Sequence, residues 1–95
     1  MAAVRLLPPA VEDLERLVAF LRVDDPHAAG ETARLMFEAL RLLEKYPLIG
    51  RAIQGERREL VIYRGRTGYL AQYQYDPGSD EVVVVAMRHQ REIEG

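Results

Sequence analysis

The sequence contains no cysteine, which excludes disulfides, thiolate metal sites and cysteine nucleophiles. It also lacks an apolar stretch approaching the roughly 20 residues of a membrane span. Its first residues lack the long apolar core of a signal peptide. Only two histidines are present, and no spacing suggests the further ligands that a metal site needs. We therefore expect a cytoplasmic protein without a metal, a cofactor or a membrane association.

Lysine is nearly absent, because Lys45 is the only lysine among 13 basic residues. Arginine favours bidentate contact with carboxylates and phosphates, but its use also follows the base composition of a genome, so this bias carries little weight. The charge is unevenly distributed. Residues 51–66 hold five arginines against two glutamates, although the net charge of the chain is −2.

Two helices are predicted in the first half of the 95-residue chain, which has the size of one domain spanning residues 1–95. Apolar residues recur at helical spacing from Val11 to Leu21, in an amphipathic helix of about three turns, with Glu12 and Asp13 near its N-terminus. Asp25 and Pro26 then start a second helix that runs to about Tyr46. The short link between them predicts an antiparallel helical hairpin. The apolar face of the second helix is expected to comprise Ala29, Ala33, Met36, Phe37, Leu40 and Leu43.

Strands are predicted on both sides of the hairpin. Residues 4–7 are a short first strand, and residues 58–63, 69–75 and 82–87 form a meander with turns between them. The last strand holds four consecutive valines and is apolar on both faces, so it should lie inside the sheet with cover on both faces. The predicted fold is α+β, with two layers and the order β-α-α-β-β-β. The helical hairpin packs on a mostly antiparallel sheet.

The polar cluster R-H-Q-R-E at residues 88–92 follows the last strand directly. A rigid strand that delivers Arg88 and His89 to the surface can support a site, while a solvated chain end is an equally good interpretation. His27, in the first turn of the second helix, is expected to be a solvated residue. The tyrosines of residues 69–75 suit base stacking on an open sheet face. Amphipathic packing, with the rings on the sheet and the hydroxyls in water, is the favoured interpretation, because stacking would also need a basic groove around the rings.

Cleavage of RNA at a 2′-hydroxyl needs a base, an acid and cations that stabilise the equatorial oxygens. The residues that could supply them without a metal are His89, Arg88, Glu59, Arg64, Arg66 and Tyr73. The same residue types are ordinary surface partners on a sheet, and Glu59 beside two arginines can simply form ion pairs.

Several short motifs, in this order and spacing, resemble the RelE/ParE superfamily of type II toxins, in particular its ParE-like plasmid-stabilisation branch. They are P-H-A-A at 26–29, P-L-I-G-R at 47–51, R-E-L-V-I at 58–62, G-Y-L at 68–70, Y-Q-Y-D at 73–76 and R-H-Q-R-E at 88–92.

The resemblance implies a toxin that forms a hetero-oligomer with a cognate antitoxin. The C-terminal segment of the antitoxin wraps the toxin, and its N-terminal part binds operator DNA, so the toxin contacts operator DNA only through its partner. The antitoxin-binding surface is expected at Leu14, Leu17, Leu21, Met36, Phe37 and Leu40.

Two activities divide this superfamily. RelE-like members cut mRNA on the ribosome, and ParE-like members poison DNA gyrase without being nucleases. A sequence pI near 5.7 suits a phosphate-dense ribosomal site poorly and favours the gyrase poison. The candidate target contacts are then Arg58, Arg88, His89 and Arg91. A metal-independent endoribonuclease and an inactive homologue acting as a binding module stay open as alternatives.

Overall fold

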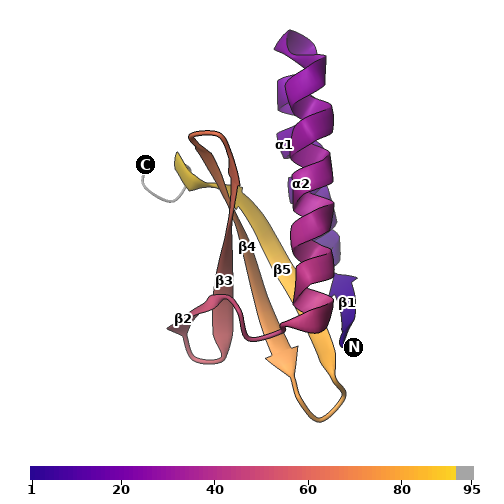
Figure 1. Cartoon of the computed structure of the whole chain (residues 1–95), viewed down its shortest axis with the longest axis vertical. Coiled ribbons are helices and arrows are strands. Elements are labelled where there is room, and N and C mark those ends of the chain that lie inside the picture. The colour runs from indigo at the N-terminus through magenta and orange to yellow at the C-terminus, as the bar shows by residue number, and fades with distance from the viewer. Residues whose placement is uncertain (92–95) are drawn as a thin grey trace.

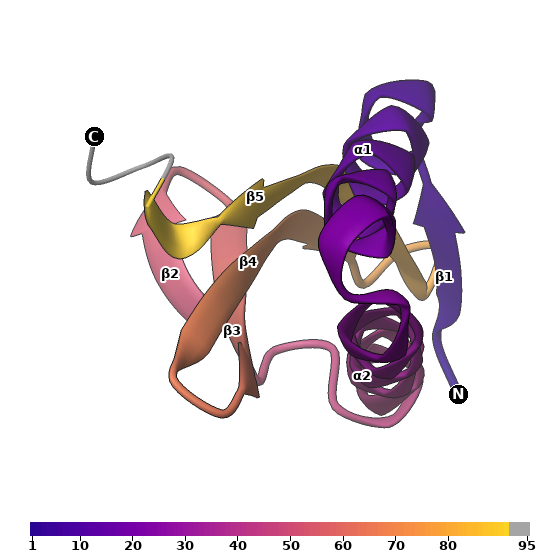
Figure 2. The same ribbon diagram turned by 90° about the horizontal axis from the view of Figure 1, so that it is seen from above.

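The computed structural model describes residues 1–91, which form two helices and a five-stranded sheet in two layers. The elements are β1 (Ala3–Leu6), α1 (Pro8–Asp24), α2 (Pro26–Lys45), β2 (Arg51–Gln54), β3 (Arg57–Arg64), β4 (Thr67–Asp76) and β5 (Glu81–His89). The helices lie side by side against one face of the twisted sheet (Figures 1 and 2). The tip of the helical hairpin projects past the sheet (Figure 1).

The sheet order is β1-β5-β4-β3-β2, and only the β1–β5 pair is parallel. The prediction that the valine strand lies inside the sheet is confirmed, since β5 runs between β1 and β4. Val82 and Val84 are fully buried beneath the helices, but Val83 and Val85 are only half-buried. The prediction that this strand is covered on both faces is therefore wrong for one of them, because the helices lie over one face alone.

The strand β2 was missed, and the order is β-α-α-β-β-β-β. Its four residues are all exposed, and its pairing with β3 shifts register between Ala52 and Gln54, so it has no period-two pattern of apolar residues. The strand β5 also runs two residues beyond the apolar run, to His89.

The helix α1 begins at Pro8 and has 17 residues, so it is longer than the predicted three turns. Its first turn holds no acidic residue, and the predicted contact of Glu12 and Asp13 with the helix N-terminus is wrong. Asp25 alone separates the helices. Its carboxylate accepts the N–H of Ala28 at 3.0 Å, which confirms the predicted start of α2.

The buried stripe of α2 differs from the predicted one at several places, since Ala28 is also buried and Ala33 is only half-buried. Thr32 is fully buried, while Phe37 is 55% exposed. Phe37 follows the buried Met36 by one position, and one helical step of about 100° carries its ring away from the sheet. The core otherwise contains Leu17, Met36, Leu40 and Leu43 from the helices against Ile62, Tyr69, Tyr73 and the β5 valines from the sheet.

Candidate functional site

An irregularity in β5 determines which way its last residues point. Gln72 pairs with Ala86 and Tyr73 pairs with Val84, so Val85 is an extra residue opposite β4. Such a bulge reverses the alternation of side chains along the strand. Val84 and Met87 are both fully buried as a result, although they are three positions apart. The same reversal turns His89 toward the helices.

His89 lies opposite Tyr69 in the β4–β5 pair, and the two rings meet edge to face with centroids 5.3 Å apart. Its Nδ1 accepts the N–H of Arg91 at 3.0 Å. Tyr69 is 2% exposed, so one side of the imidazole rests on the core while the ring as a whole is half-buried. The structure therefore holds His89 in a defined orientation.

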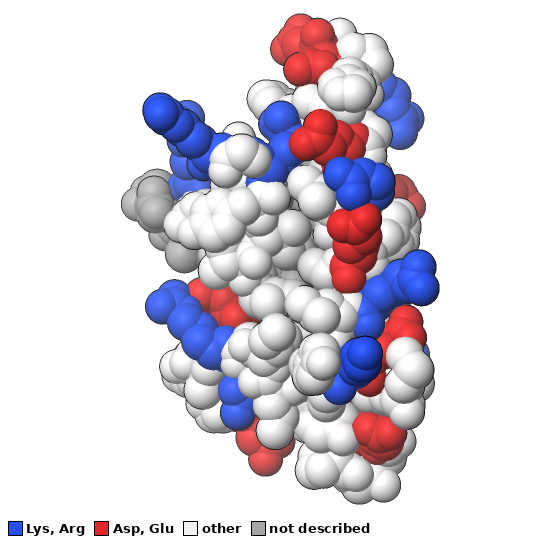
Figure 3. All heavy atoms as spheres, in the orientation of Figure 1, with Lys and Arg blue, Asp and Glu red and all other residues white. Residues whose placement is uncertain are grey.

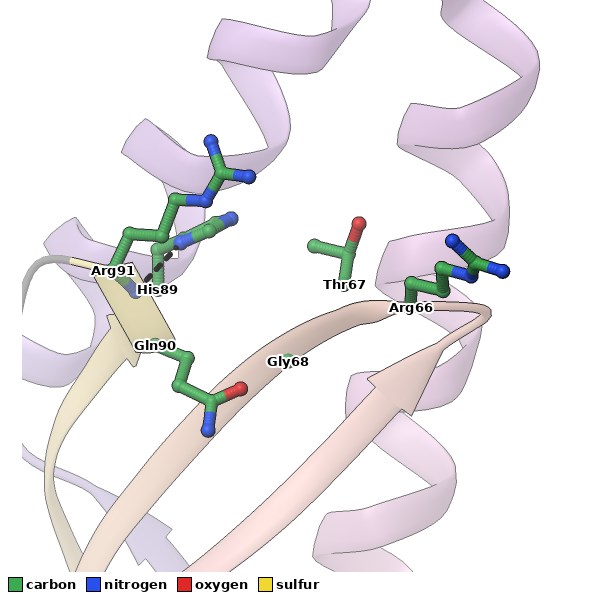
Figure 4. A pocket seen from close by; sticks show the side chains of 6 residues that line it. All are labelled: Arg66, Thr67, Gly68, His89, Gln90 and Arg91. Carbon is green, nitrogen blue, oxygen red and sulfur yellow. Dashed lines mark hydrogen bonds between the residues drawn. The ribbon is translucent and has the colours of Figure 1, made fainter. Parts of the chain in front are cut away.

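Three adjoining hollows surround His89. One of about 400 Å³ is lined by Arg66, Thr67, Gly68, His89, Gln90 and Arg91 (Figure 4). The side chains of His89 and Arg91 lie next to each other in this view, and Gln90 turns the other way, over Gly68. A side chain at position 68 would collide with the Gln90 amide, so Gly68 leaves the room that Gln90 occupies.

The other two hollows open toward α1. They are lined by Leu17 and Phe20 with Arg16, His89 and Arg91, and by Leu17, Phe20 and Leu21 with Arg64, Thr67, Tyr69 and His89. No acidic residue is among the described residues that line the three hollows. Basic side chains gather in Figure 3 beside the turn between β3 and β4 and the end of β5. This end of the molecule is thus locally basic, although the whole chain is weakly acidic.

Arg64 ends β3, and Gly65 and Arg66 form the two-residue turn to β4, in which the φ of 60° at Gly65 suits glycine. Arg66 is exposed. Arg64 is half-buried, and its Nε is buried without a hydrogen-bond partner in residues 1–91. The sequence-predicted residues that meet here are therefore Arg64, Arg66, His89 and Arg91. Glu92 of the predicted cluster lies outside the described residues.

Arg88 is bound to α1. Its Nη1 donates to Asp13 Oδ1 at 2.9 Å, and Asp13 Oδ2 accepts the main-chain N–H of Met87 at 3.0 Å. Arg16 also lies 3.7 Å from Asp13. Asp13 was not among the site residues predicted from the sequence. It is 74 residues from Met87, and no local pattern reports such a contact.

Glu59 and Tyr73 make structural contacts in a second cluster, around Gly50. Glu59 is 6% exposed and accepts two hydrogen bonds from Arg51, at 3.0 and 2.7 Å. The Tyr73 hydroxyl accepts the N–H of Gly50 at 2.8 Å, and Arg58 donates to the carbonyl of Gly50 at 2.7 Å. Burial raises the pKa of Tyr73, against the opposing effects of the Gly50 bond and of Arg58.

Both expectations for the sheet tyrosines are wrong at Tyr69 and Tyr73. These side chains are 2% and 0% exposed and face the helices, so they offer no platform to a base, and the Tyr73 hydroxyl does not reach water. Alternation along the strand placed them correctly on one face. Which face the helices cover was decided by packing.

The predicted antitoxin-binding residues separate into buried and accessible ones. Leu17, Met36 and Leu40 are 6%, 0% and 6% exposed and fill the core, so a partner cannot contact them on the folded surface. Leu14 and Leu21 are half-buried. Phe37 is exposed, and so are Phe20 at 77% and Val23 at 83%, which the sequence analysis did not select. The sequence did indicate that Phe20 and Val23 are exposed, because both lie off the apolar stripe of α1.

No group of three or more histidine, aspartate or glutamate side chains within residues 1–91 is placed to hold a metal ion. Neither helix of this described part is long and apolar enough to cross a membrane. His27 is exposed and lies 3.8 Å from Glu31, one helical turn away, far along the chain from the β5 end.

Solved structures share this fold. A chain of the chromosomal ParDE system from P. aeruginosa matches with a TM-score of 0.75 and 16% identity, over 94% of this chain and 96% of that one. A chain of the intact E. coli RelBE toxin–antitoxin complex matches with a TM-score of 0.68 and 12% identity, over 93% and 95%. At these identities the likeness establishes the RelE/ParE-like fold.

Sequence comparison identifies the family. The toxin RelE3 of Caulobacter vibrioides is 34% identical over 92 residues, which are 97% of this chain and 98% of that protein. The sequence pattern of the ParE toxin of type II toxin–antitoxin systems, parDE, matches residues 4–94. The protein is thus a type II toxin of the RelE/ParE superfamily. Within that superfamily it belongs to the ParE toxin family, which confirms the resemblance of its motifs.

Proposed function

We propose that this toxin acts by inhibiting DNA gyrase in the cytoplasm, without nuclease chemistry, and that a cognate antitoxin neutralises it. The observation that carries the proposal is the burial and hydrogen bonding of the residues that a nuclease would need. Glu59 is buried in a two-bond contact with Arg51, and the Tyr73 hydroxyl is buried against Gly50. Both groups are engaged in structural contacts, and His89 is left without a second acid or base from the predicted set beside it.

The basic end around His89 then serves as a contact surface. Arg66 and Arg91 are exposed there, with no acidic side chain among the described residues that line the hollows. Arg58, which was also predicted to contact the target, instead donates to the carbonyl of Gly50 and holds that loop. Target binding is therefore proposed to depend on His89, Arg91 and Arg66, with Arg88 in a supporting place.

The antitoxin is proposed to cover the exposed apolar residues of the helical hairpin. The neighbours P. aeruginosa ParDE and E. coli RelBE are toxin–antitoxin systems, and this supports a hetero-oligomer. A segment that becomes ordered on the hairpin would bury Phe20, Val23 and Phe37, whose exposure in the toxin alone is unfavourable.

The test compares two purified reactions. The toxin is added to DNA gyrase in a supercoiling assay and, separately, to translating ribosomes with a defined mRNA. We expect loss of supercoiling and intact mRNA. Cleaved mRNA with unaffected gyrase would replace the proposal with the nuclease alternative. Failure in both reactions, together with normal growth when the chain is induced, would favour the inactive homologue.

The nuclease alternative has one observation in its favour, the gathering of Arg64, Arg66 and Arg91 around His89. If it holds, His89→Ala abolishes mRNA cleavage and Glu59→Gln leaves cleavage intact in the folded protein, because Glu59 belongs to the other cluster. Gyrase inhibition by the wild type, without mRNA cleavage, rejects this alternative.

A further inference from the structure

The strand β5 is longer than its parallel neighbour. The β1–β5 pairing runs from Ala3 and Glu81 to Leu6 and Val84, and the N–H of Leu7 adds a last bond to the carbonyl of Val84 at 3.0 Å. Pro8 then begins α1, and proline has no N–H to continue the ladder. Beyond Val84, β5 is paired with β4 alone, and the other edge of its backbone faces α1.

Asp13 occupies that edge. It lies in the second turn of α1, and its side chain is only 13% exposed. One carboxylate oxygen accepts the main-chain N–H of Met87 at 3.0 Å, and the other accepts Arg88 Nη1 at 2.9 Å. Both bonds involve a charged acceptor and are partly shielded from water, which makes them strong for hydrogen bonds. A helix side chain thus replaces the missing strand partner.

We propose that Asp13 is a positioning residue, which fixes the direction in which the end of β5 presents Arg88 and His89. Met87 is the last buried anchor of the strand, and the residues after the bulge depend on its backbone orientation. Asp13 holds that backbone on one side while Tyr69 supports the His89 ring on the other. It also pairs the charge of Arg88 and lies 3.7 Å from Arg16, which lines a hollow beside His89, while Arg66 and Arg91 are the other exposed arginines there.

The backbone part of this inference rests on the contacts alone, and its effect on inhibition rests on the proposed function. Asp13→Ala removes both bonds. Asp13→Asn keeps a carbonyl acceptor for Met87 and removes the charge that binds Arg88. Glu12→Gln is the matched control, because Glu12 is the exposed neighbour on the same helix.

The first measurement is amide hydrogen exchange and the imidazole NMR signals of the whole toxin. In Asp13→Ala we expect the Met87 amide to exchange at least about tenfold faster relative to Val84, and the His89 signals to shift as its packing on Tyr69 changes. Glu12→Gln should leave both unchanged. Unchanged exchange at Met87 and unchanged His89 signals in both Asp13 variants would overturn the proposal.

The second measurement separates positioning from general stability. Gyrase inhibition and antitoxin affinity are measured for Asp13→Asn, Arg88→Ala and the double variant, at temperatures well below their melting midpoints. If Asp13 acts through Arg88, Asp13→Asn weakens inhibition about tenfold in the wild type and has little further effect in Arg88→Ala. Equal effects in both backgrounds would show a merely structural role and reject the positioning role.

A failure of the proposed function can be distinguished from a failure of the inference about Asp13. If the wild type does not inhibit gyrase, the proposed target is wrong, while exchange at Met87 and the His89 signals still test Asp13. If Asp13→Ala does not fold, Asp13→Asn and Arg88→Ala carry the test, because each keeps an acceptor for the Met87 N–H. Wild-type inhibition by both, with unmoved His89 signals, would overturn the proposal.

Discussion

At the scale of single residues, Tyr73 shows how a group suited to chemistry becomes part of the scaffold. Its hydroxyl lies in the core and accepts the N–H of Gly50. That bond joins the loop after α2 to the middle of the sheet, and Arg58 adds a second one from β3. The loop is therefore held from two strands.

Tyr73→Phe removes this acceptor and leaves the Gly50 N–H buried without a partner. We expect the free energy of unfolding to fall by about 1–3 kcal/mol, measured by denaturant unfolding near neutral pH. Tyr63→Phe is the control, because Tyr63 is 59% exposed and its change should stay within about 0.5 kcal/mol. Equal losses in the two variants would contradict a role for the Gly50 bond.

The same variant has a pH dependence of known sign. Burial raises the pKa of Tyr73 above its ordinary 10.0, so the unfolded chain loses the phenol proton at lower pH than the folded protein does. The stability that Tyr73 contributes is fully present below about pH 10 and declines above it. The gap between wild type and Tyr73→Phe should therefore be constant up to about pH 9 and narrow above about pH 10. A constant gap would show that Tyr73 does not titrate differently on folding.

At the scale of elements, the edge strand β2 depends on one ion pair. Arg51 is 75% exposed at its side chain, but Glu59 beneath it is 7% exposed, so the carboxylate depends on this one cation. Because β2 contributes no buried residue, this pair adds a side-chain contact with β3 to the main-chain pairing of the two strands. The stability of the pairing between β2 and β3 should thus depend on Arg51.

Arg51→Ala leaves a buried carboxylate without its partner, and we expect a loss of about 1–3 kcal/mol in the free energy of unfolding. Arg34→Ala removes the same kind of pair, with Glu38, at an exposed place on α2 where both side chains are more than half exposed. That control should cost less than about 1 kcal/mol. Denaturant unfolding measures both, and a larger loss in Arg34→Ala would reject the argument.

Two glycines, one in a helix and one in a loop, should respond to substitution by alanine with stability changes of opposite sign. Nothing lies within 4 Å of a Cβ at Gly30 in α2, whereas a Cβ at Gly50 would stand 2.7 Å from the Tyr73 hydroxyl. Gly30→Ala should raise the free energy of unfolding by about 0.5–1 kcal/mol. Gly50→Ala should lower it by about 1–3 kcal/mol through overpacking. Thermal or denaturant unfolding tests both signs, and a stabilised Gly50→Ala would show that the loop is not held as described.

At the scale of the whole molecule, the core and the proposed antitoxin-binding surface lie on different faces of the same helices. Met36 and Phe37 are neighbours on α2, yet the first is fully buried and the second 55% exposed. The helical hairpin also extends past the sheet (Figure 1), and Phe20, Val23 and Phe37 on its helices are exposed. The toxin alone is a complete fold that keeps an apolar outer surface.

Substituting Met36 and Phe37 one at a time should separate the contribution to stability from the contribution to antitoxin binding. Met36→Ala should lower the free energy of unfolding by about 2–5 kcal/mol. Phe37→Ala should change stability by less than about 0.5 kcal/mol but weaken antitoxin binding about tenfold, which is about 1.4 kcal/mol. Calorimetric titration with the cognate antitoxin and denaturant unfolding provide the two readouts. Unaltered affinity in Phe37→Ala would move the docking surface elsewhere.

Much of the fold could be predicted because its signals are local. Helical spacing, the Asp25–Pro26 start and the turn residues between strands define both helices, the meander and the interior place of the valine strand. The strand β2 escaped prediction because four exposed residues with a register shift carry no pattern. Phe37 was assigned to the apolar face of the second helix because an apolar ring near a stripe looks like part of it, and only the packing of α2 excludes it from the buried stripe.

By itself the sequence determined the α+β class, the helical hairpin, the basic character of the cluster that ends β5, and the resemblance to ParE-like toxins. These follow from periodicity, turn chemistry and motif order, which are properties of neighbouring residues. The tertiary structure alone decided that Tyr73 and Glu59 are structural, that the Val85 bulge aims His89 at the helices, and that Asp13 holds Met87 and Arg88. Each of these depends on contacts between segments distant in the chain, up to 75 residues apart, which no local pattern encodes.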